Sequence, residues 1–92
     1  MSDSETLLEQ KYQEAFDEEF TLLERRRAAD AALTVADLEG TLKTLYVVQG
    51  NNWDGRSALL DTAISAQIAA YEVFIDRWKK EIVSASIEKK PI

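Results

Sequence analysis

The sequence predicts an all-α protein, a three-helix bundle with two long outer helices and a shorter middle helix, completed by oligomerisation. Helix breakers are scarce, since the 92 residues include one proline, near the end at Pro91, and three glycines. Apolar residues recur at intervals of three and four, the spacing of one helix face. Only one segment resembles a strand, so a sheet is not expected.

The first helix is expected over about residues 5–32. Ser2 and Glu5 have the spacing of a capping box, and acidic residues crowd the first turns, where they stabilise a helix N-terminus. Further along, five apolar residues share one face: Leu8, Tyr12, Phe16, Phe20 and Leu23. This face is expected to meet the other helices.

The second helix is expected over about residues 34–49. Thr34 is the predicted N-cap, Asp37 stands at the third helical position, and Leu33 and Leu38 have the spacing of a hydrophobic staple. Gly50 is expected in the left-handed conformation that ends many helices. The segment LYVV could also end a strand, but it continues a helical stripe of Leu38, Leu42, Leu45 and Tyr46.

The third helix is expected over about residues 55–84, beginning at Asp54 or Ser57, with a frayed tail at 85–92. Its apolar residues follow a heptad-like spacing that is usual in helix bundles. They are Ile64, Ile68, Tyr71, Ile75, Trp78 and Ile82. Further apolar residues widen this arc to nearly half of the circumference. The whole chain, residues 1–92, is expected to form one helical domain.

The stretch GNNWDGRS, residues 50–57, differs from a Walker A motif only by Arg56 in place of lysine. We interpret it as a turn between two helices, because a phosphate-binding loop needs a sheet behind it and Asp54 would repel the phosphates. Trp53 and Arg56 are unusual in a plain turn and are typical of binding hot spots, so they are candidate partner contacts.

Composition argues against a catalytic, cofactor-binding or metal site. The chain has no cysteine and no histidine, so it lacks the commonest general base and the commonest metal ligand. Carboxylates facing one core could still bind two metals, but in the acidic run EAFDEEF only Glu19 borders the apolar stripe. Arg25, Arg26 and Arg27 are consecutive and spread around the helix, although Arg27 and Asp30 lie nearer the core and are expected to form a polar clamp at the helix end.

The net charge of −6 makes nucleic acid and anionic membranes poor partners. We also find no uninterrupted apolar run near the roughly 20 residues that a membrane span needs. The first ten residues do not resemble a signal peptide, so a cytoplasmic location is expected.

Charge also favours an antiparallel arrangement of the two long helices, within one chain or between subunits. A homodimer is expected because the short middle helix would leave part of the third helix bare. The predicted interface residues are Phe74, Ile75, Trp78 and Ile82. The alternative is that the first helix covers this strip within one chain, through Leu8, Tyr12 and Phe16.

Two functions follow from these observations. The first is a non-enzymatic protein-interaction module, such as an adaptor, chaperone or regulator, that acts as a homo-oligomer and could also bind another protein. The second is a metal-dependent helical enzyme of the nucleotide pyrophosphohydrolase type. An inward cluster of carboxylates would favour the second function.

Overall fold

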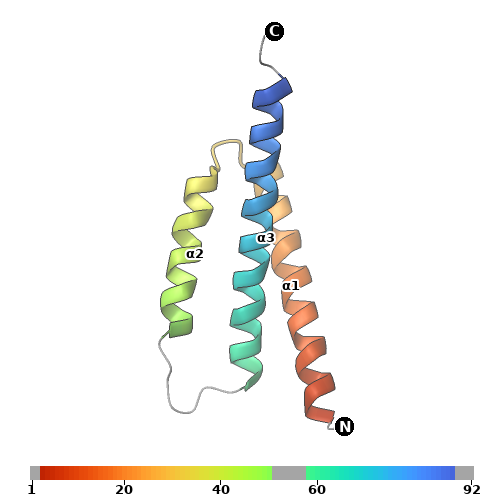
Figure 1. The fold of residues 1–92 in the computed structure, drawn as a ribbon. Coiled ribbons are helices and arrows are strands. Elements are labelled where there is room, and N and C mark those ends of the chain that lie inside the picture. The colour runs from red at the N-terminus through yellow and green to blue at the C-terminus, as the bar shows by residue number, and fades with distance from the viewer. Residues whose placement is uncertain (1–2, 51–57, 89–92) are drawn as a thin grey trace.

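The computed structural model describes residues 3–50 and 58–88, which form three helices and contain no strand (Figure 1). They are α1 (Asp3–Ala29), α2 (Val35–Gly50) and α3 (Ala58–Glu88). The all-α class is therefore confirmed. Compared with the expected bounds, α1 ends earlier and α3 continues further, into the segment interpreted as a tail. Gly50 is the last residue of α2 and has no left-handed φ, so its predicted capping conformation is wrong.

The start of α2 is a capping box, as predicted. The Asp37 amide donates to Thr34 Oγ1 at 3.1 Å, and the Thr34 amide donates to Asp37 Oδ2 at 3.0 Å. Two amides without helical partners are thereby satisfied by side chains. Leu33 and Leu38 flank this cap and are both buried, so the hydrophobic staple is confirmed.

Asp30 explains why α1 ends before residue 32. Its amide donates the last helical bond to the Arg26 carbonyl, and its carboxylate accepts a hydrogen bond from the Ala32 amide at 3.0 Å. The Leu33 amide then donates to the Asp30 carbonyl. A short polar side chain that bonds to a nearby amide in this way favours a turn over continued helix.

The helices run up, down and up, so α1 and α3 are parallel to each other and antiparallel to α2 (Figure 1). The expectation that the long helices pack antiparallel within one chain is therefore wrong. Exposed ion pairs contribute only about 0–1 kcal/mol each, whereas a fully buried large apolar side chain contributes about 1.5–3 kcal/mol. Apolar burial therefore decides the direction of the helices, and charge does not.

α3 is the central helix of the fold and packs against both of the others (Figure 1). No Cα atom of α1 lies within 8 Å of a Cα atom of α2. The wide apolar arc of α3 thus serves two neighbours that barely meet each other. This arrangement is more open than a bundle in which every helix packs on every other.

The core lies where residues from all three helices converge. Its buried members are Leu23, Leu33, Leu38, Tyr71, Phe74 and Ile75, and Leu38 has no exposed surface. Ile64, Ala66, Ile68 and Ala70 continue the buried face along α3. Within the described residues the buried set contains no polar or charged side chain, so the interior is apolar apart from the Tyr71 hydroxyl.

The register between the helices repeats over one heptad. Arg27 pairs with Glu81 and Phe20 packs on Phe74, and each pair is 54 residues apart. α2 runs antiparallel to α3. Tyr46 of α2 contacts Glu72 of α3. Glu39 lies seven residues before Tyr46, and it contacts Lys79, which lies seven residues after Glu72. Each long contact is therefore repeated about two turns along.

α3 is more hydrophobic over its length than the sequence analysis led us to expect. Over Ala58–Ala85 it is long and apolar enough to cross a membrane by length and composition, with a mean hydropathy of 1.3 in its most apolar window. Asp61 and Glu72 interrupt the run, which is why no unbroken apolar segment is visible. Of that window, 39% is buried within the fold, and a core helix with two neighbours has this composition too.

We expect Thr34→Ala to lower the free energy of unfolding by about 0.5–2 kcal/mol, because it removes the side-chain acceptor of the cap. Urea denaturation followed by circular dichroism measures the effect. Thr44→Ala is the matched control, since this hydroxyl only donates to the Gly40 carbonyl within α2, and its effect should stay within about 0.5 kcal/mol. Equal losses in both variants would contradict the role of the cap.

Candidate interaction surface

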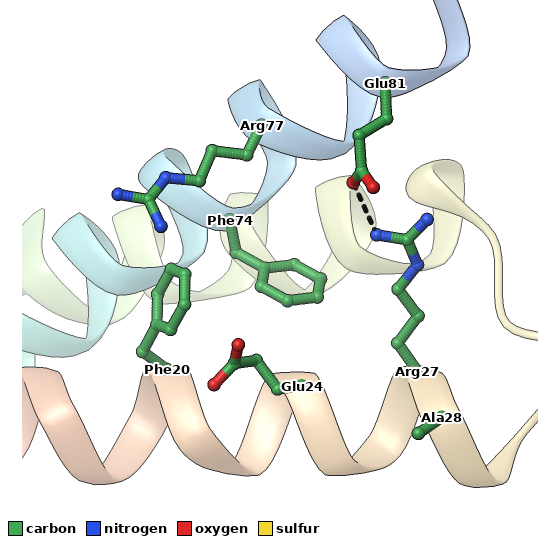
Figure 2. Close-up of a pocket in the computed structure, with 7 residues that line it drawn as sticks. All are labelled: Phe20, Glu24, Arg27, Ala28, Phe74, Arg77 and Glu81. Atoms are coloured by element: carbon green, nitrogen blue, oxygen red, sulfur yellow. Dashed lines mark hydrogen bonds and ion pairs between the residues drawn. The ribbon is translucent and has the colours of Figure 1, made fainter. Parts of the chain in front are cut away.

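An open cleft of about 430 Å³ lies between α1 and α3 (Figure 2). Its volume is within the range of small-molecule and side-chain binding sites, although it is wide open to solvent. Seven residues line it: Phe20, Glu24, Arg27, Ala28, Phe74, Arg77 and Glu81. The parallel register of α1 and α3 brings these residues together.

The floor of the cleft is aromatic. The rings of Phe20 and Phe74 meet edge to face with centroids 5.5 Å apart, and Phe16 stacks on Phe20 at 5.9 Å. Phe74 also meets Trp78 edge to face at 6.0 Å. Such pairs add about 0.5–1.5 kcal/mol each beyond the area that they bury. The row of four rings therefore joins the middle of α1 to the second half of α3.

Arg27 closes one end of the cleft. Its guanidinium donates to Glu81 Oε2 at 2.7 Å (Figure 2). The same guanidinium lies 4.1 Å from the centre of the Trp78 ring. A planar guanidinium stacks on an aromatic ring while it pairs with a carboxylate, which an ammonium does less well. The expected clamp between Arg27 and Asp30 does not form, because Asp30 bonds to the Ala32 amide instead.

Arg77 and Glu24 bring two further charges to the cleft. The Arg77 guanidinium lies 5.2 Å from the centre of the Phe20 ring, and the Glu24 carboxylate turns toward the aromatic floor (Figure 2). Neither forms an ion pair within the part of the chain that the structure describes. The cleft therefore suits an apolar or aromatic group that carries a polar substituent, such as a side chain of a partner protein.

The predicted interface strip on α3 is divided by the structure. Phe74 and Ile75 are buried in the core of the chain itself, and Trp78 is half-buried under Arg27. Ile82 is 53% exposed. The expectation that all four side chains stay bare in one chain is wrong, because α1 and α2 cover α3 from two sides. The use of this strip in a dimer stays a prediction.

The alternative cover through the first helix is confirmed in part. Phe16 joins the aromatic row, but Phe20 and Leu23 make the main contacts with Phe74 and its neighbours. Tyr12 is 38% exposed and Leu8 is half-buried. The two candidate partner contacts, Trp53 and Arg56, and the rest of residues 51–57 lie outside the described residues, so those predictions remain open.

Carboxylates do not gather into a metal site in residues 3–50 and 58–88, where no group of three or more potential ligands is found. Glu14, Asp17 and Glu18 are exposed, whereas Glu19 is half-buried, as its place beside the apolar stripe predicted. Burial raises the pKa of Glu19 above its ordinary value. Arg25 and Arg26 are exposed.

A polar edge fastens α2 to α3. The Tyr46 hydroxyl donates to Glu72 Oε2 at 2.5 Å, Lys79 Nζ donates to Glu39 Oε2 at 2.7 Å, and the Gln49 amide donates to Ser65 Oγ at 3.3 Å. All of these groups are exposed or half-buried. They mark the register of α2 against α3, while the apolar side of α2 provides the burial.

Large apolar side chains are exposed on all three helices. They are Leu7, Tyr12, Leu22, Tyr46, Val47, Val48, Leu59, Leu60, Ile82 and Val83. Sequence reasoning predicted only Ile82 among them. The exposure of Leu22 could have been predicted from the sequence. Leu22 lies beside the stripe of Leu8, Tyr12 and Phe16, and it follows Ala15 by seven residues.

Comparison with known proteins does not identify a family for this chain. No protein-family model, curated protein or solved structure matches the chain significantly. Function is therefore argued from the geometry of the described residues alone.

We expect Arg27→Lys to lower the free energy of unfolding by about 0.5–1 kcal/mol, because lysine keeps the charge but loses the stacking on Trp78. Arg25→Lys is the matched control, since Arg25 is exposed and has no contact of this kind. Urea denaturation monitored by tryptophan fluorescence compares the two variants. Indistinguishable midpoints would show that the Arg27–Trp78 contact adds nothing to stability.

The Tyr46–Glu72 hydrogen bond should be visible in a pH titration. It raises the pKa of Tyr46 above the ordinary value of about 10, because the carboxylate accepts from the neutral phenol and repels the phenolate. Since the folded pKa is raised, the stabilising effect is complete below about pH 10 and is lost as the pH rises through the folded pKa.

Glu72→Gln should therefore lower the pKa of Tyr46, measured by tyrosinate absorbance. Tyr46→Phe identifies its signal among the three tyrosines. A titration unchanged by Glu72→Gln would mean that the hydrogen bond does not form in solution.

Proposed function

We propose that this chain is a non-enzymatic protein-interaction module that acts as a homo-oligomer. The observation that carries the proposal is the exposure of large apolar side chains on all three helices, beside a buried set without polar or charged residues. Monomeric proteins expose single apolar residues routinely, but ten in a chain of this size favour a protein that buries some of them against a partner.

The cleft between α1 and α3 adds to this support. It offers an aromatic floor beside the Arg77 guanidinium and the Glu24 carboxylate, both without ion-pair partners in the described residues. Interfaces gain specificity from charges around an apolar centre, and aromatic and arginine side chains contribute most to binding. Such a cleft can receive one anchoring side chain of a partner.

The second candidate, a metal-dependent enzyme of the pyrophosphohydrolase type, receives no support from the described residues. Its mechanism needs carboxylates that converge on one metal-binding interior. Glu18 and Asp17 are exposed, and Glu72 and Asp76 are engaged with Tyr46 and Lys80 at the surface. The interaction module is thus the better-supported function.

Light scattering over a concentration series tests the proposal. We expect a mass above that of one chain, reduced by Ile82→Glu, which places a charge on an exposed apolar position without disturbing the core. Ser84→Glu adds the same charge at an exposed polar position of α3 and should leave the mass unchanged. A monomeric mass for the native protein at every concentration, with no protein partner captured by it, would contradict the proposal.

A further inference from the structure

The outer face of α1 carries a second row of apolar residues, which shares Leu8 and Tyr12 with the stripe predicted from the sequence. Leu8, Ala15 and Leu22 recur every seven residues, and Tyr12 lies on the same side. The inner face, with Phe20 and Leu23, packs against α3. Leu22 is 55% exposed and Tyr12 is 38% exposed, so this row lacks a full cover within one chain.

Charges are arranged symmetrically about Leu22. Glu18 and Glu19 precede it by four and three residues, and Arg25 and Arg26 follow it by three and four. Residues three and four positions away lie on the same side of a helix as Leu22 itself. The turn before Leu22 is therefore acidic on this side, and the turn after it is basic.

These four charged side chains have few opposite charges to pair with on α1. Glu18, Glu19 and Arg25 have no opposite charge three or four positions away on α1, and Arg26 has only Asp30, whose carboxylate bonds to the Ala32 amide. None of the four forms an ion pair within the described chain.

We infer that a second copy of this chain packs on the outer face of α1, antiparallel, with the two-fold axis beside Leu22. A two-fold axis there places Glu18 opposite Arg26 of the partner subunit and Glu19 opposite Arg25 of the partner subunit, and the same pairs form again in the other direction. A parallel pair would instead bring acidic turns onto acidic turns. The inference rests on the proposed function, and it names the surface and the partner.

Small and apolar residues at the ends of this stretch fit the same axis. Ala15 and Ala29 are each seven residues from Leu22, so the axis brings each of them against the other in the partner. Alanine allows two helices to approach closely. Burial already raises the pKa of Glu19, and a nearby arginine offsets the cost of covering this carboxylate further.

The face extends onto α3. Burial raises the pKa of the core residue Tyr71, the charge of Glu19 raises it further, and the charge of Arg26 lowers it. Ile82 continues the helical line of Tyr71, Ile75 and Trp78. The 54-residue register sets the exposed Ile82 level with Ala28, and the proposed axis sets Ala28 level with residue 16 of the partner's α1, in the first half of that helix.

Reciprocal charge reversal tests the geometry. The double variant Glu18→Arg/Glu19→Arg and the double variant Arg25→Glu/Arg26→Glu should each raise the dimer Kd at least about tenfold, because like charges then face each other. An equimolar mixture of the two should recover the dimer, since every pair is again of opposite sign. Analytical ultracentrifugation from about 1 µM to about 100 µM measures the three samples.

Asp17→Arg/Glu24→Arg is the matched control. It makes the same change of net charge as Glu18→Arg/Glu19→Arg, at exposed positions on the side of α1 opposite to Leu22, so its Kd should change less than about threefold. A mixture that stays monomeric, or a control that is weakened as much as the test variants, would overturn the inference.

Cysteine cross-linking gives a second measurement that does not depend on the charge variants folding. The chain has no cysteine, so Leu22→Cys introduces a single thiol near the proposed axis, and it should form a disulfide-linked dimer under mild oxidation. Tyr12→Cys should stay unlinked, because an antiparallel pair separates the two copies of residue 12. Efficient linkage through Tyr12→Cys, or none through Leu22→Cys, would contradict the antiparallel pair.

The outcomes also separate this inference from the proposed function. A native dimer that is insensitive to the charge variants and unlinked at Leu22→Cys overturns the α1 interface but leaves a homo-oligomer. A native protein that is monomeric at about 100 µM overturns both the α1 interface and the homo-oligomer.

Discussion

The fold depends on α3 being apolar on two sides. α1 covers one side and α2 covers the other, and these two helices do not approach each other along their length. Leu38 of α2 and Leu23 of α1 therefore reach the same core only at the end where the chain passes from α1 to α2. This one constraint accounts for the open arrangement, for the hydropathy of α3, and for the apolar surface that the outer helices leave exposed.

Local features of the chain could be predicted from the sequence, and the sharing of one helix between two neighbours could not. The Thr34 cap is encoded by four adjacent residues, and the seam of α3 is encoded by its own spacing. Whether Phe74 is covered depends on α1, which is some 50 residues away in the chain, and periodicity does not say which of two helices supplies the cover. Phe74 and Ile75 were predicted to be exposed because the short α2 alone cannot cover them.

The cleft and its charged residues likewise could not be predicted from the sequence alone. Arg27 was placed near the core by its position on the helix, but its partners Trp78 and Glu81 follow only from the parallel register of α1 and α3. That register is set by burial of Phe20 and Leu23, because the ion pair at its end is exposed and adds about 0–1 kcal/mol. Polar contacts thus report the register, while apolar packing determines it.

The relative direction of α1 and α3 is therefore independent of how charge is distributed along them. Because apolar burial makes α1 and α3 parallel, the acidic first part of α1 does not face the basic last part of α3. Glu18, Arg25 and Arg26 are exposed and Glu19 is half-buried, and none of the four forms an ion pair within the described residues. A charge order that forms no ion pair within the described residues and is centred on an exposed leucine is available to another surface.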